Sequence, residues 1–109
     1  MNLDQKIENL YRPSNRITTR IIHAAIPHGA IREIERIIGL ETDEYFKIEA
    51  DDSSMEYIFE YSEIICVVII KSPQSKIELN YVESQTDPQS IEHLCNIFEP
   101  YRVLSRRRR

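Results

Sequence analysis

A run of seven consecutive apolar residues, 64–70, is the strongest pattern in the chain. It reads Ile-Ile-Cys-Val-Val-Ile-Ile and lies between Glu63 and Lys71. β-Branched side chains favour extended backbone, and an unbroken apolar run is typical of a strand covered on both faces. The run is far shorter than the about 20 apolar residues that a membrane-spanning helix needs. We therefore expect it to form the central strand of a small sheet.

Three further segments alternate between apolar and polar residues, which is the period of a strand. Residues 45–50 and 55–61 flank an acidic turn at 51–54, and residues 77–81 follow a turn around Pro73. The connections are short, so the four segments predict an antiparallel meander rather than parallel crossovers.

Two places in this pattern have two readings. Ser62-Glu63 either reverses the chain or lies within one long bent strand, because no Gly, Pro or Asn marks a turn there. Residues 101–104 form either a further strand or a trailing segment.

Helical spacing of apolar residues, at three- and four-residue intervals, recurs in four segments. These segments are residues 3–11, 17–25, 31–38 and 91–98. Pro13 and Pro27 end the first two helices. Gly39 is a suitable residue just after the third, and Asp87-Pro88 is a suitable N-cap and first residue for the fourth.

The predicted fold class is α+β, with N-terminal helices, a four-stranded antiparallel β-meander and a C-terminal helix packed on one sheet face. All the helices are expected to pack on that same face. A length of 109 residues corresponds to one domain, which we assign to residues 1–104. Residues 105–109 form a basic tail that has no reason to fold. The apolar face of strand 55–61 exceeds what short helices can cover, so we expect a homodimer or another protein partner.

The charged residues are distributed unevenly along the chain, which has a net charge of −4. Residues 41–63 contain nine acidic residues and one Lys, whereas residues 100–109 contain five Arg and no acid. Acidic and aromatic residues alternate in the predicted sheet, and this combination suits a protein partner with a basic surface. The residues expected to bind that partner are Tyr45, Glu49, Glu56, Tyr57, Glu60 and Tyr61.

The leading functional hypothesis is therefore a non-enzymatic protein-interaction module, acting as an adaptor, an inhibitor or an immunity-like protein. The alternative is a nucleic-acid-binding protein, since arginines pair with phosphates and one predicted helical face is basic. The arginines of this alternative are Arg12, Arg16, Arg20, Arg106, Arg107, Arg108 and Arg109.

No pattern in the chain indicates catalytic, metal or cofactor chemistry. The histidines at 23, 28 and 93 and the cysteines at 66 and 95 have no metal-ligand spacing. Cys66 lies within the apolar run, where burial raises a thiol pKa and disfavours the reactive thiolate. The amphipathic, charged start of the chain is unlike a signal peptide, so we expect an intracellular, cytoplasmic protein that does not enter the membrane.

Overall fold

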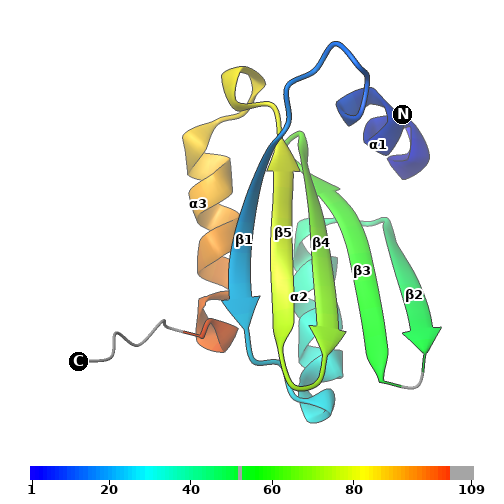
Figure 1. The fold of residues 1–109 in the computed structure, drawn as a ribbon, viewed down its shortest axis with the longest axis vertical. Coiled ribbons are helices and arrows are strands. Elements are labelled where there is room, and N and C mark those ends of the chain that lie inside the picture. The colour runs from blue at the N-terminus through cyan, green and yellow to red at the C-terminus, as the bar shows by residue number, and fades with distance from the viewer. Residues whose placement is uncertain (52, 104–109) are drawn as a thin grey trace.

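The computed structural model describes residues 1–51 and 53–103 of the protein, which form three α-helices and a five-stranded antiparallel sheet (Figure 1). The helices are α1 (Leu3–Leu10), α2 (Ile31–Glu41) and α3 (Pro88–Ile97). The strands are β1 (Thr18–Ala24), β2 (Tyr45–Asp51), β3 (Ser54–Tyr61), β4 (Ile64–Lys71) and β5 (Ser75–Tyr81). The predicted α+β class is confirmed, with one more strand than expected.

The apolar run lies in β4, which is the middle strand of the order β1-β5-β4-β3-β2. The four strands from β2 to β5 form the expected meander, and every neighbouring pair in it is antiparallel. Ser62 and Glu63 reverse the chain between β3 and β4, so this junction is a turn and not a bend in one long strand. Both residues have positive φ, 51° and 67°, which is the left-handed region that favours glycine.

The predicted helix over residues 17–25 is wrong, because this segment forms β1 at the edge of the sheet. Its buried residues are Ile22, Ala24 and Ile26, which alternate with exposed ones in the period of a strand. The β-branched residues at its start also favour extended backbone. The helical spacing of Ile17 and Ile21 was coincidental.

Helices α2 and α3 cover one face of the sheet, where most of the core lies, and α2 passes behind the strands in Figure 1. The largest side chains in this core include Tyr57, Phe59 and Phe98, all fully buried. Helix α1 packs on the opposite face, where Leu3 and Leu10 contact Ile65 in a second, smaller cluster. The expectation that all helices share one face is therefore wrong for α1.

Local sequence signals explain where two of the helices begin. Asn2 and Gln5 form a reciprocal capping box at the start of α1, and the Asp87 side chain accepts from the Gln89 N–H at the start of α3. Gly39, in contrast, lies inside α2, which continues to Glu41.

Residues 101–103 run beside β1 as a short continuation of the sheet edge. Arg102 forms an isolated antiparallel bridge with Ala24. The Ala25 N–H donates to the Tyr101 carbonyl across 2.8 Å, and the Val103 N–H donates to the His23 carbonyl across 2.9 Å. The expected basic tail, 105–109, lies outside the described residues.

Candidate functional site

The tyrosines expected to bind a partner lie on the sheet face that α2 and α3 cover. Tyr57 is fully buried, and Tyr45 and Tyr61 are half-buried against the same core. Glu49 lies on this side of the sheet as well, opposite Met55 of β3. The expectation that short helices leave this face uncovered is wrong. Tyr57 in particular is buried and is not accessible to a partner.

Tyr57 instead makes a polar contact with α2. Its hydroxyl donates to Glu35 Oε2 across 2.5 Å, and Lys47 Nζ contacts the same oxygen at 2.8 Å. Hydrogen bonds from Lys47 and Tyr57 lower the pKa of the Glu35 carboxyl. Burial and the bond to Glu35 raise the pKa of the Tyr57 phenol well above its usual value. This trio is a structural link, because both donors serve one carboxylate and none of the three is poised to react.

Among the described residues, helix α1 covers one end of the other sheet face. It packs there through the cluster of Leu3, Leu10 and Ile65, against which Phe46 and Ile58 also pack. Figure 1 shows α1 near the end of the sheet where β3 leads into β4. Four β-branched aliphatic residues on this face belong to neither core cluster, and we call them the open-face patch. They are Ile21 of β1, Ile48 of β2, and Val67 and Ile69 of β4.

Strand register places charged side chains within the open-face patch. Glu78 lies opposite both Ile21 and Val67, so it separates them in one row across the sheet. In the next row Ile69 lies between Lys76 on one side and Glu56 on the other.

Glu56 is in turn opposite Ile48, which completes the row. Ile21 and Ile48 are the most exposed members of the patch, with 47 % and 43 % of their surface accessible. The patch therefore combines exposed aliphatic side chains with carboxylates, which is a composition suited to protein contact.

One ion pair links two charged residues of the patch. Lys76 Nζ pairs with Glu78 Oε2 at 3.0 Å, so these two residues largely neutralise each other. Tyr11 is the C-cap residue of α1. Partial burial and the nearby Glu78 carboxylate raise the pKa of the Tyr11 phenol.

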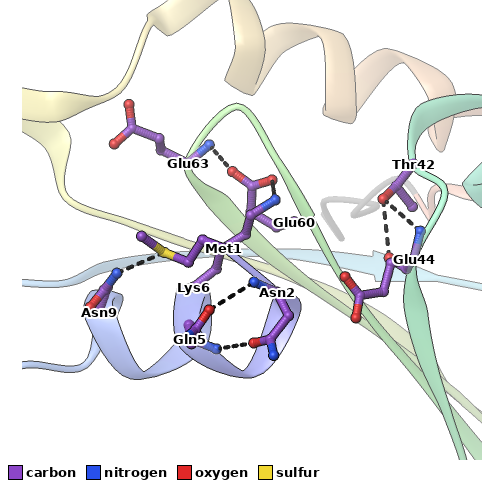
Figure 2. A network of polar contacts seen from close by, with 9 residues as sticks. All are labelled: Met1, Asn2, Gln5, Lys6, Asn9, Thr42, Glu44, Glu60 and Glu63. Atoms are coloured by element: carbon purple, nitrogen blue, oxygen red, sulfur yellow. Dashed lines mark hydrogen bonds and ion pairs between the residues drawn. The ribbon is translucent and has the colours of Figure 1, made fainter.

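A cleft of about 290 Å³ lies between α1 and the ends of β3, β4 and β5. Figure 2 shows Glu60 joined to both Lys6 and Glu63 there. Glu60 Oε1 pairs with Lys6 Nζ at 3.3 Å, and its Oε2 accepts from the Glu63 N–H at 2.6 Å. The carboxylate of Glu60, expected to bind a partner, is thus already engaged in holding α1 and the β3–β4 turn.

Two further polar side chains of the cleft have partners within it. Asn15 donates to the carbonyls of Asn9 and Leu10, and the Thr86 hydroxyl donates to the Val82 carbonyl. No His, Cys or Ser is among the residues that line the cleft. The lining therefore provides no serine or cysteine nucleophile beside a histidine base.

The arginines of the nucleic-acid hypothesis are not gathered on a helix. Arg12 and Arg16 lie in the connection between α1 and β1, and Arg20 lies in β1 opposite Leu79. Their four-residue spacing therefore gives no common face. Arg106, Arg107, Arg108 and Arg109 lie outside the described residues.

Residues with metal-binding or nucleophilic side chains do not form a second site in the described part of the chain. No three His, Cys, Asp or Glu residues come together there as metal ligands. Cys66 and Cys95 are free thiols, and burial strongly raises the pKa of Cys66. None of the helices formed by residues 1–51 and 53–103 is long and apolar enough to cross a membrane.

Similarity to known proteins gives no further guidance to this site. No protein family, curated protein or solved structure matches the chain. The open-face patch must therefore be interpreted from its own geometry.

Sequence reasoning missed the open-face patch although its signal was present. The alternation in strand 55–61 correctly separates two faces, with Tyr57 on one and Glu56 on the other. The pattern does not reveal which face the chain's own helices cover, since Val67 and Val68 are chemically identical but point to opposite faces. Ile21 was missed because its segment was assigned to a helix.

Proposed function

We propose that this protein is a non-enzymatic protein-interaction module, and that its open-face patch binds the partner. The observation that supports the proposal is that Ile21, Ile48, Val67 and Ile69 share one sheet face and pack into neither core cluster. Exposed apolar residues grouped on one face are characteristic of protein-contact surfaces, whereas scattered ones are ordinary.

The chemistry of the patch indicates a partner with apolar side chains surrounded by basic groups. Glu56 lies between Ile48 and Ile69, and it brings a negative charge to the middle of the patch. The segment 41–63, which includes β2 and β3, carries nine acidic residues and one Lys. This excess raises the rate of encounter with a basic surface, while the aliphatic residues supply the contact area.

The revised surface keeps Glu56 from the original set of expected residues and replaces the tyrosines with β-branched residues. Tyr57 is excluded because it is buried, and Glu60 because both of its oxygens are engaged. An interaction role is also consistent with the cleft, where the side chains of Asn15, Glu60 and Thr86 are engaged in contacts within the protein.

The test compares wild type with two variants in affinity capture from an extract of the source organism. The double variant Ile21→Glu/Ile69→Glu places charge at two positions of the patch. Leu40→Glu is the matched control, because Leu40 is an exposed apolar residue on α2 with 70 % of its surface accessible. Circular dichroism and thermal unfolding must first show that all three proteins fold.

We expect one protein to be captured by wild type and Leu40→Glu but not by the double variant. After purification, that protein should bind the double variant about 30-fold or more weakly, the effect of losing about 2 kcal/mol at a contact centre. Equal binding to all three proteins would overturn the proposal. Salt-sensitive binding of a labelled RNA or DNA duplex, unchanged in the double variant, would instead favour the nucleic-acid hypothesis.

A further inference from the structure

Strand β2 is an edge strand, the last in the sheet order. Within residues 1–51 and 53–103 it pairs with β3 and with no other strand. Among the described residues, no backbone hydrogen bond outside the regular elements involves Tyr45–Asp51. Alternate N–H and C=O groups of an edge strand point away from the sheet, where they can pair with another strand.

The sequence of β2 is complementary to itself when two copies run antiparallel. A two-fold axis perpendicular to the sheet, midway between Ile48 and its equivalent in the second copy, places these two residues opposite each other. The same axis places Lys47 opposite the second copy's Glu49. The apolar Ile48 then faces itself, and the one basic side chain faces an acidic one. Opposite charges directly across two strands stabilise the pair.

Each neighbouring register places like charges directly opposite each other at its centre. An axis between the two Lys47 residues opposes two lysines, and an axis between the two Glu49 residues opposes two glutamates. Like charges at directly opposed positions destabilise a strand pair. Registers displaced by a single residue are excluded, because they would place the helix side of one copy opposite the open side of the other.

Lys47 can bind a carboxylate of the second copy while it keeps its contact with Glu35 of α2. Its Nζ contacts Glu35 Oε2 at 2.8 Å, while 42 % of its side chain stays accessible. An ammonium group has three donors, so it can bind Glu35 and a carboxylate from another chain together. Glu49 is exposed as well.

We propose that β2 is a homodimer interface, in which two copies pair antiparallel about a two-fold axis that lies between their Ile48 residues. The two five-stranded sheets then form one continuous sheet. The β-bulge between Glu49 and Asp51 ends the regular part of the strand, so the contact is short and the dimer weak. This proposal rests on the edge of the sheet, independently of any partner on the open-face patch.

The experiment is sedimentation velocity at low salt, over micromolar to millimolar protein concentration. Wild type should show a reversible monomer–dimer equilibrium. Lys47→Glu and Glu49→Lys should each weaken it at least tenfold, because each variant places like charges opposite one another twice. An equimolar mixture of the two variants should recover dimers, since every charged pair across the heterodimer is then attractive.

The overturning results are equally specific. A wild-type monomer at all concentrations would overturn the interface, and so would a dimer that neither variant weakens. If Lys47→Glu weakens the dimer and Glu49→Lys does not, the register is overturned, because Glu49 then does not lie opposite Lys47 of the second copy. If loss of the Glu35 contact prevents Lys47→Glu from folding, Glu49→Lys decides the question. Its mixture with wild type should then dimerise more than Glu49→Lys alone but less than wild type alone.

The double variant Ile21→Glu/Ile69→Glu separates this interface from the partner-binding surface. Both substitutions lie outside β2, so the double variant should dimerise as wild type does. A result that overturns the dimer interface therefore does not overturn the proposed partner surface. A result that overturns the partner surface likewise does not overturn the dimer interface.

Discussion

The hydroxyl of Tyr57 donates a hydrogen bond to Glu35 across 2.5 Å and so joins the third strand of the sheet to helix α2. Glu35 lies on the inner side of α2, and 28 % of its side chain is accessible. A carboxylate at the border of an apolar core is stable there only when donors compensate for its lost water. Tyr57 and Lys47 provide those donors.

Replacing Tyr57 by Phe removes the hydroxyl and leaves Glu35 with Lys47 alone. We expect the free energy of unfolding to fall by about 1.5–3 kcal/mol, the usual contribution of a hydrogen bond to a charged group. Urea unfolding measures the change. Tyr45→Phe is the matched control, because the Tyr45 ring packs edge-on against Tyr57 at 5.8 Å, but its hydroxyl makes no hydrogen bond within the described residues. A similar loss in both variants would mean that the hydroxyl of Tyr57 contributes nothing.

The stability that Glu35 provides should depend on pH. Its folded-state pKa lies below its ordinary value of 4.5 because Lys47 and Tyr57 stabilise the carboxylate. The contribution is therefore fully present above the unfolded-state pKa and is lost as pH falls through the lower folded-state pKa. Wild type should exceed Glu35→Gln in stability at neutral pH, and the difference should shrink toward zero under acidic conditions. A difference that stays constant from neutral pH down to acid unfolding would contradict this account.

Two adjacent valines in β4 should respond differently to the same substitution. Val68 is fully buried against the helices, so Val68→Asp leaves a charge without water or a partner and should prevent cooperative folding. Val67 is half-buried on the opposite face, and Val67→Asp should fold with a loss of about 1–2 kcal/mol. Thermal unfolding followed by circular dichroism distinguishes them. A folded Val68→Asp protein would show that this face is not the core.

The β3–β4 turn should gain stability from a glycine. Glu63 has φ of 67°, a conformation that costs a residue with a Cβ about 1–2 kcal/mol. Glu63→Gly removes this strain at some cost in chain entropy and should stabilise the protein by about 0.5–1 kcal/mol. Glu63→Ala keeps the Cβ and should bring no gain, which separates backbone strain from loss of the carboxylate. Equal effects of Gly and Ala in chemical denaturation would argue against strain.

Sequence patterns predicted most of the sheet because local signals agree there. The apolar run of β4 and the alternation in β3 each give one interpretation, and the structure confirms both. In β1 the signals conflict, since Ile17, Ile21, Ala24 and Ala25 fit a helix while Ile22, Ala24 and Ile26 fit a strand. This segment forms a strand because it pairs with β5, and such a long-range contact cannot be predicted from the local sequence.

The candidate surface was harder to predict because it depends on where the helices pack. The alternation in β3 assigns Tyr57 and Glu56 to opposite faces of the sheet. Both faces of β4 are apolar, so the sequence allows α2 and α3 to pack on either face. The sequence signal that distinguishes the faces is Glu35, whose carboxylate needs a donor on the sheet. Tyr57 is that donor, and it was instead interpreted as a surface anchor.

The bridge between Ala24 and Arg102 makes the two edges of the sheet unequal. A strand that adds to β1 along its full length must first displace residues 101–103 and break their hydrogen bonds to His23 and Ala25. Growth at both edges would produce a filament, whereas growth at one edge about a two-fold axis closes after a single addition. This short contact therefore opposes growth of the sheet at the end of β1 where it lies.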